Sequence, residues 1–406
     1  MLVITWLWLI LPRGGEAIPR GRSFYHVVKN LWPLAIWLIL AFFLHFKAFC
    51  SLNAYFSLKF LEFIVAYGTT AVLFQETSIK LRFFKLFAAL GTVQAGLALS
   101  QFFLQHPLGL FKLGEQQIFT WNQGIAKLVV NGATYIRGYG TFPHPNLLSA
   151  FLVATIFILV YLFLETQKTG KKIIYSLMLA ISVFGLIITF SRAGFLALGV
   201  GIVIYFGYFL LKKLPKTYFV PLGTILVSLI IAIVIFKPFL LTRNTITDSA
   251  ALQRIFYAKV GWQIIKANPV FGVGIGESVL HMQQFSPVKL WPWQIQPIHN
   301  YFELAAAELG IPGALILIWI FLSHLWKLVA RSKSTLNTYY VLLATILVSS
   351  LILMLFDHYF YTLQQTQLLL WLLLGAIAGE TRQQTSEVVS FGRQTKNPQI
   401  GDNPKT

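Results

Sequence analysis

Long apolar runs alternate with short polar segments along most of the chain. Many of the runs approach the roughly 20 residues needed to cross a hydrocarbon core about 30 Å thick. In lipid, every backbone amide must find a partner inside its own segment, so we expect each run to be a helix. The pattern predicts ten spans, at about 31–49, 53–75, 83–103, 147–165, 172–190, 194–211, 218–236, 304–326, 338–356 and 364–379.

The expected fold class is therefore all-α, a polytopic transmembrane helical bundle that occupies residues 1–380 as one membrane domain. Two longer polar segments interrupt the spans, at about 104–146 and 237–303, and the second is expected to be partly helical. The tail at 381–406 is rich in Gln, Ser, Thr, Asn and charge. It cannot bury enough apolar surface to fold, so we predict that it is disordered.

Composition supports a membrane protein. The chain is 57% hydrophobic and 11% charged, whereas soluble domains carry about 25% charged residues. A formal charge of +19 would suggest nucleic acid for a soluble protein, but here most basic residues lie in short loops. Anionic membrane lipid explains them better, so we expect no nucleic-acid partner. The single cysteine, Cys50, excludes an intrachain disulfide and a Cys-based zinc site.

The basic residues also indicate an orientation. Ten spans put both chain ends on one side of the membrane, and most of the 32 Lys and Arg residues fall in the loops on that side. The positive-inside rule then predicts that both termini, including the tail, are cytoplasmic. The segments at 104–146 and 237–303 are predicted to be external.

A polar cluster precedes the fourth predicted span, in Arg137-Gly-Tyr-Gly-Thr-Phe-Pro-His144-Pro-Asn146. Pro145 suits the first turn of a helix, because its missing N–H costs nothing there. Free amides and the helix dipole attract anions to a helix N-terminus, and Arg137 would strengthen that attraction. The cluster is either an anion site or a well-capped helix start with a glycine turn.

A second arginine, Arg192, lies in Thr-Phe-Ser-Arg-Ala-Gly at the predicted outer end of the fifth span. The flanking sequence is apolar. A charge that the topology rule does not explain is a functional candidate. Arg192 either reaches outward to the lipid headgroups or points into a cavity and binds a substrate phosphate.

The long segment at 237–303 carries Arg254 in an amphipathic stretch and a Gly-Val-Gly-Ile-Gly turn at 272–276. The glycines resemble part of a dinucleotide-binding fingerprint, but no βαβ unit surrounds them. A turn that lets the backbone approach a ligand or a helix is the better interpretation.

The segment ends in His299-Asn300, where the chain re-enters the membrane, followed by Glu303. If a helix begins near Asn300, His299 and Glu303 lie one turn apart on one face, and Glu303 could orient the imidazole. The alternative is a helix cap with a favourable acidic first turn.

Two other polar groups stand beside or within predicted spans. Lys59 and Glu62 are three residues apart in the second span, and we favour a structural ion pair over part of a polar cavity wall. Asp357-His358-Tyr359 lies at the predicted outer end of the ninth span. His358 is either a second site histidine or part of an interfacial polar cluster.

Together these motifs resemble the O-antigen ligase and polymerase superfamily over about residues 130–315. The resemblance lies in the order of the pieces and in their placement beside the membrane. The matching pieces are Arg137…Gly-Thr-Phe-Pro-His144-Pro-Asn146, Thr-Phe-Ser-Arg192-Ala-Gly, Arg254, Asn268-Pro-Val-Phe-Gly-Val-Gly-Ile-Gly276, and His299-Asn300-Tyr-Phe-Glu303…Glu308-Leu-Gly310.

The resemblance implies a multi-pass protein of the cytoplasmic (inner) membrane. Members of that superfamily transfer a glycan from a polyprenyl (usually undecaprenyl) diphosphate carrier to an acceptor hydroxyl of a lipid, glycan or protein. They are inverting and metal-independent, so no cofactor is expected. Ligases typically have twelve spans and this chain has about ten, so the acceptor class is left open.

The same resemblance implies roles for individual residues. Arg192 and Arg254 fall where the superfamily binds the diphosphate, and His299 falls where it has its proposed base. We add Arg137, His144, Asn146, Asn300 and Glu303 as candidate substrate-binding residues. A polysaccharide polymerase of the same superfamily and a lipid-linked oligosaccharide flippase are the alternatives. Clustering of the polar residues at one membrane face favours chemistry over transport.

Overall fold

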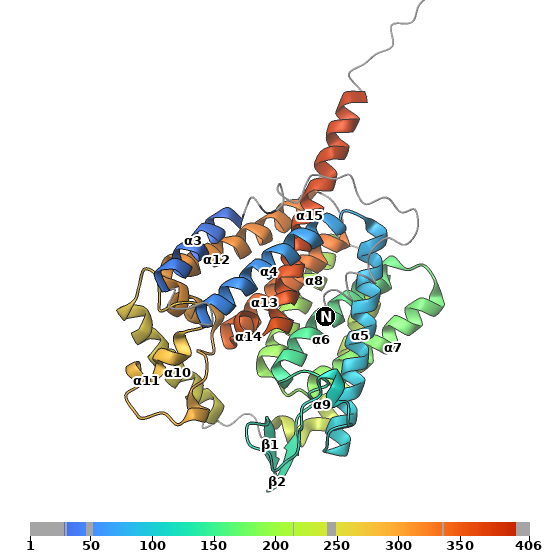
Figure 1. The fold of residues 1–406 in the computed structure, drawn as a ribbon. Helices are drawn as coiled ribbons and strands as arrows, with labels where there is room; N and C mark the ends of the chain where they lie inside the picture. The colour runs from blue at the N-terminus through green and yellow to red at the C-terminus, as the bar shows by residue number, and fades with distance from the viewer. Residues whose placement is uncertain are drawn as a thin grey trace, which may run out of the picture.

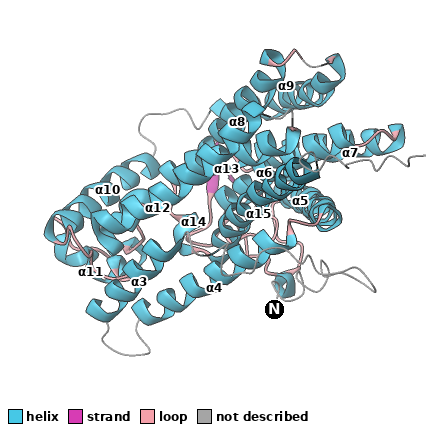
Figure 2. Cartoon of the chain, turned by 90° about the horizontal axis from the view of Figure 1, so that it is seen from above, coloured by secondary structure: helices cyan, strands magenta, loops and turns pink. Residues whose placement is uncertain are grey.

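Helices form most of the described chain (Figures 1 and 2). The computed structural model describes residues 28, 31–45, 52–213, 215–241, 249–334 and 337–394. The long helices are α3 (Trp32–His45), α4 (Leu52–Leu73), α5 (Thr77–Leu104), α6 (Pro145–Glu165), α7 (Thr169–Ile187), α8 (Arg192–Leu211), α9 (Val220–Leu241), α10 (Ser249–Ala267), α12 (Tyr301–Ser334), α13 (Thr338–Phe356) and α15 (Gln364–Gln394).

Shorter elements connect them. They are η2 (Phe111–Leu113), η3 (Lys216–Phe219), α11 (Ser278–Phe285), η4 (Pro292–Gln294), α14 (Tyr359–Thr362) and the strands β1 (Lys127–Val130) and β2 (Ala133–Ile136). The strands form an antiparallel hairpin in which Val130 pairs with Ala133. Asn131 and Gly132 between them have φ of 51° and 82°, as a two-residue hairpin turn requires.

Eight helices of the described residues are long and apolar enough to cross a membrane. They include η3 joined to α9, and they coincide with eight of the ten predicted spans. The other two predicted runs are also helical: α3 has 14 residues, and α15 becomes polar after Ala378. The polytopic helical bundle is confirmed, and the count of ten spans stays a prediction.

The predicted disordered tail at 381–406 begins inside a helix, because α15 runs to Gln394. Residues 395–406 lie outside the described residues. Arg243, in the middle of the long polar segment, lies outside them as well.

α6 is at the centre of the bundle. It packs against α5, α7 and α13, while α13 also packs along α8 and α12, and α15 packs along α4. α6 carries apolar residues on all of its faces, and most of them are buried. This pattern is typical of a helix enclosed by other helices. Within α4, Lys59 Nζ lies 2.9 Å from Glu62 Oε2, which confirms the ion pair.

α12 is broken at Gly310, whose φ of 75° and ψ of 170° are not helical. The break leaves backbone carbonyls without their usual intrahelical donors, and such groups must be satisfied elsewhere. Donors come from outside the helix: Val273 N to Ala307 O (3.0 Å), Gly274 N to Glu308 O (3.0 Å) and Trp37 Nε1 to Leu309 O (2.9 Å).

The glycine turn at 272–276 therefore approaches a helix. Gly272, Gly274 and Gly276 all have positive φ, and a Cβ on Gly272 would lie 2.4 Å from the Glu308 carbonyl carbon. The carboxylate of Glu308 accepts from Gly276 N at 2.6 Å and from Ser278 Oγ at 2.7 Å. Of the two partners predicted for this turn, the structure shows the helix.

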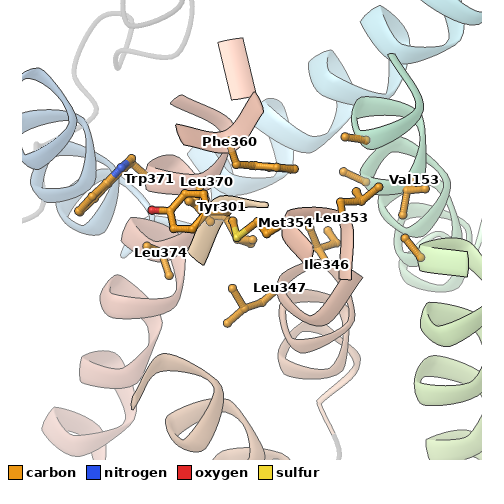
Figure 3. Close-up of a cluster of buried hydrophobic side chains, with 14 of the residues drawn as sticks. Val153, Tyr301, Ile346, Leu347, Leu353, Met354, Phe360, Leu370, Trp371 and Leu374 are labelled. Atoms are coloured by element: carbon orange, nitrogen blue, oxygen red, sulfur yellow. The ribbon is translucent and has the colours of Figure 1, made fainter. Parts of the chain in front are cut away.

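Figure 3 shows part of the buried apolar core. It combines side chains of α6, α12, α13, α14 and α15. Tyr301, Met354 and Phe360 are each at most 4% exposed. These residues follow His299 or flank Asp357 and His358 in the chain, so packing of the core holds the backbone of those polar residues in place.

Candidate active site

Ends of five helices meet on one side of the bundle and bring polar side chains together. α6 begins after His144, α12 begins after Asn300, and α13 ends before Asp357. Between α7 and α8, Ser191 caps the start of α8. α10, α14 and the hairpin lie on the side of the bundle away from the protruding end of α15 (Figure 1). The polar groups are thus far apart in sequence and close in space.

Asp357 joins three of these elements. Its Oδ2 accepts a hydrogen bond from Asn146 Nδ2 at 3.0 Å and lies 3.9 Å from Arg254 Nη2. Its Oδ1 accepts from the backbone N of His358 at 3.0 Å. The Asp357 side chain is 9% exposed and that of Arg254 is 31% exposed. A buried carboxylate therefore connects α6 and α10 at the end of α13.

Arg137 holds Asn146 in place through a hydrogen bond. It is 4% exposed, its Nε donates to the carbonyl of Thr189 at 2.6 Å, and its Nη2 donates to Asn146 Oδ1 at 2.9 Å. Asn146 thus accepts from Arg137 and donates to Asp357. The first predicted cluster is a tightly packed helix start that forms one wall of the site.

His144 is the cap of α6, since its Nδ1 accepts from Asn146 N at 3.1 Å. An accepting Nδ1 carries no proton, so the neutral ring has its N–H at Nε2. Burial, assisted by the positive charge of Arg137, lowers the pKa of His144 well below its ordinary value. The ring of Tyr359 lies 5.3 Å from that of His144.

His299 is held by aromatic contacts. Its ring stacks on Tyr257 of α10, with centroids 5.4 Å apart and planes 15° from parallel. The ring of His358 meets it edge-on at 5.1 Å and 88°. Among the described residues the buried Nδ1 of His299 has no hydrogen-bond partner. The ring is therefore fixed in orientation, and its Nδ1 is buried without a partner among the described residues.

Burial keeps both of these histidines neutral. It lowers the pKa of His299 to about 4, and the Arg254 guanidinium lowers it further. The backbone of Pro297 partly offsets the effect. Burial, followed by the charges of His299 and Arg254, lowers the pKa of His358 to about 3. Each imidazole is therefore unprotonated at neutral pH.

The carboxyl of Asp357 is shifted the other way. Burial raises its pKa to about 6, although the Asn146 hydrogen bond and the Arg254 charge act against the rise. At pH 7 the group is mainly ionised and can hold Arg254 by charge. The site thus combines a guanidinium that can bind an anion with a neutral imidazole that can take a proton.

Asn300 is a helix cap. Its Oδ1 accepts from the backbone N of Phe302 at 2.9 Å and of Glu303 at 3.1 Å. Its Nδ2 donates to the carbonyl of Leu355 at 3.0 Å. Asn300 therefore ties the start of α12 to the end of α13, which is the capping alternative considered for this position.

Glu303 lies in the first turn of α12, as the capping alternative expected, and its role in orienting His299 stays a prediction. α12 begins at Tyr301, which leaves His299 just outside the helix. The Glu303 carboxylate faces α10, where a Cβ on Gly261 would lie 3.0 Å from its Oε1. The ring contacts of His299 come from Tyr257 and His358.

Arg192 is exposed at the first residue of α8, next to the Ser191 cap. Arg254 contacts Asp357 directly, and Arg137 reaches the same carboxylate through Asn146. Of the two arginines expected to bind diphosphate, Arg254 is therefore the one that the structure places at the Asp357 cluster. The role of Arg192 stays a prediction.

The O-antigen ligase family model matches residues 177–318. This match supports the assignment to the O-antigen ligase superfamily that the motifs indicate. Together with the candidate spans of the described residues, it indicates a multi-pass membrane protein and a glycosyltransferase of the ligase and polymerase type. No curated protein sequence matches the chain.

The matched segment runs from α7 into α12. It contains Arg192, Arg254 and His299. Asn146 and Asp357, which complete the cluster, lie outside it on either side.

Three residues of the cluster were missed or undervalued from the sequence. Asp357 and His358 read equally well as an interfacial pair, and Tyr257 read as part of an amphipathic stretch. The signal available for Asp357 was its rarity: it is one of only 13 acidic residues in the chain, and it stands at the end of an apolar span, where an ionisable side chain is a candidate for function.

Proposed function

We propose that this superfamily member transfers a glycan from a polyprenyl diphosphate carrier to an acceptor hydroxyl, as an inverting glycosyltransferase. The observation that carries the proposal is the position of His299. A neutral imidazole with an unpartnered nitrogen is held beside Arg254 and Asp357. Such a pairing suits a reaction in which a hydroxyl loses a proton while an anion departs.

Arg254 would bind the diphosphate. Its 3.9 Å approach to Asp357 is an ion pair longer than a hydrogen bond, so its N–H groups can turn to phosphate oxygens. One charge pair at about 4 Å is of order 4 kcal/mol at an effective dielectric of 20. Arg192 would contribute a second guanidinium when donor is bound. Charge grows on the diphosphate as it leaves, so these contacts stabilise the transition state.

His299 would act as the base. The acceptor oxygen gives its proton to the imidazole and forms a bond to the anomeric carbon, while the bond from that carbon to the diphosphate oxygen breaks. The carrier diphosphate leaves with the electron pair. Attack on the face opposite the diphosphate inverts the anomeric carbon. A bound diphosphate near His299 would raise the low pKa of the free site toward neutrality.

His144, Asn146, Asn300, Glu303 and Arg137 complete the proposal as residues that shape the binding site. We further propose that the site faces outward from the cytoplasmic membrane, with both termini in the cytoplasm, in line with the distribution of basic residues. Metal independence is part of the proposal: two guanidinium groups can neutralise a leaving diphosphate, and the sequence contains no Asp-X-Asp pair.

The test is reconstitution of the full chain with a purified polyprenyl diphosphate glycan. The expected result is release of carrier diphosphate by the wild type and loss of release, by about 10²–10⁴-fold, in His299→Ala. His281→Ala, on α11 of the same segment, is the matched control and should behave as wild type. A wild type that moves donor between leaflets without releasing carrier diphosphate would identify a flippase and reject the proposal.

A further inference from the structure

Two exposed tryptophans form a flat aromatic surface on the segment between α11 and α12. The rings of Trp291 and Trp293 are stacked, with centroids 5.3 Å apart and planes 4° from parallel. The residues are 58% and 68% exposed. Exposed apolar surface costs about 25 cal/mol per Å², so a stacked pair kept open to solvent points to a binding role.

Local hydrogen bonds hold the pair in place. Trp291 N donates to Gln294 Oε1 at 2.9 Å, and Gln294 N donates to the carbonyl of Trp291 at 2.8 Å. Gln296 Nε2 donates to the carbonyl of Trp293 at 3.1 Å, and Leu290 N donates to Gln283 Oε1 at 2.7 Å. The surface is thus prepared before any ligand arrives, which lowers the entropic cost of binding.

One side chain connects this surface to the proposed base. Tyr257 donates its hydroxyl hydrogen to the carbonyl of Gln294 at 2.6 Å, and its ring stacks on His299. The contacts run from the tryptophan pair through Tyr257 to His299 and from there to His358 and Asp357. The tryptophan pair is therefore linked to His299 through Tyr257.

The surroundings favour a sugar over lipid. Tryptophans that anchor a protein in a membrane stand at the ends of apolar spans, whereas this pair stands in a polar segment that is not a candidate span. One face of a pyranose ring carries C–H groups and its edge carries hydroxyls. Such a ring can lie on a flat indole while its hydroxyls reach polar groups around it.

We propose that Trp291 and Trp293 form a stacking subsite for the sugar chain of the acceptor. The acceptor of this enzyme is then a glycan, rather than a protein or a simple lipid. The inference rests on the proposed function, because it takes His299 as the group that meets the acceptor hydroxyl. It assigns the acceptor class that the superfamily alone leaves open.

The first experiment measures binding without transfer. Glycans released from the envelope of the producing cells are labelled fluorescently and passed over the full chain immobilised in nanodiscs. Wild type should retain them, and the double variant Trp291→Ala/Trp293→Ala should bind about tenfold more weakly, or ~1.4 kcal/mol. Trp121→Ala removes an exposed stacked tryptophan on the other long segment and should bind as wild type. Failure of the wild type to retain any glycan would overturn the subsite.

The second experiment measures steady-state transfer. The double variant should raise the KM for a glycan acceptor about tenfold with kcat unchanged, and Trp291→Phe/Trp293→Phe should restore most of the affinity. A raised KM for the donor would assign the surface to the donor's glycan and overturn the inference. Transfer by wild type with unaffected tryptophan variants removes the subsite and leaves the proposed function. If the wild type binds glycan through the tryptophans but transfers none, the subsite stands and the proposed function is rejected.

Discussion

Arg137 and Arg254 come from the two long polar segments and approach the same Asn146–Asp357 pair, yet their situations differ. Arg137 is 4% exposed and its guanidinium donates at 2.6 Å and 2.9 Å to protein oxygens. The Arg254 side chain is 31% exposed and approaches Asp357 only to 3.9 Å. One guanidinium is bound into the protein, and the other remains able to bind a substrate.

The same contrast extends to the segments that carry them. In the first, Glu115 is 5% exposed and accepts from Gln101 Nε2 and from the backbone N–H of Leu108. In the second, the Nδ1 of His299 has no partner among the described residues, and the tryptophan pair is open. Satisfied polar groups build a scaffold, and groups with spare hydrogen-bonding capacity are the ones available for chemistry.

The largest expected effect tests the open arginine. Arg254→Ala should lower glycan transfer about 10²–10³-fold while the folded protein stays in the membrane, because it removes charge stabilisation and little packing. Arg254→Lys should rescue poorly, since an ammonium cannot contact two phosphate oxygens as a planar fork. The measurement is release of carrier diphosphate, with a thermal melt as the control for folding. Turnover near the wild-type rate in Arg254→Ala would show that Arg254 does not bind the substrate.

Arg137→Ala should act through stability. Removing a buried guanidinium takes the donor away from Asn146 Oδ1 and from the carbonyl of Thr189, which costs about 3 kcal/mol or more. The expected result is a clearly lower Tm in detergent and a reduced yield of folded protein, in contrast to Arg254→Ala. A stable Arg137→Ala protein that has lost only activity would show that Arg137 is the substrate-binding arginine of the pair.

The pH dependence tests the link between Asp357 and Arg254. Burial raises the pKa of Asp357 to about 6, so its carboxylate is lost as the pH falls through 6 and Arg254 loses its anchor. We expect kcat/KM for the donor to be level above pH 7 and to fall below pH 6. His299, with a pKa of about 4, would add a second decline at lower pH. Asp357→Asn should lower kcat/KM overall and abolish its decline near pH 6. A wild-type kcat/KM that stays constant down to pH 5 would contradict a role for the Asp357 carboxylate in this decline.

The smallest effect concerns the cap of α12. Asn300→Ala removes two bonds to backbone N–H groups and one bond to Leu355, and should cost about 1 kcal/mol of stability. Transfer should fall only a few fold, because the His299 backbone loosens while its chemistry is retained. Asn300→Asp should keep the cap and most of the stability. A thermal melt and a transfer assay distinguish these outcomes; a loss of transfer as large as that of Arg254→Ala would assign Asn300 a direct role.

The sequence alone predicted the parts of this protein that depend on local physics. Apolar runs of sufficient length must be helices in lipid, and the helix caps follow from residues beside the helix starts, such as His144-Pro145 and Asn300. The hairpin was also readable, because Asn131-Gly132 stands between two β-rich stretches, but it was missed inside a segment treated as a loop. The order of the motifs along the chain was enough to indicate the superfamily.

Only the tertiary structure decided which polar residues work together. Asn146 and Asp357 are 211 positions apart, and no periodicity relates two residues that meet only when α6 packs against α13. The same holds for the glycine turn, whose partner is the break in α12, and for Tyr257 against His299. Burial then separated Arg137 from Arg254, because two identical side chains acquire different roles once one has its hydrogen bonds filled by protein and the other does not.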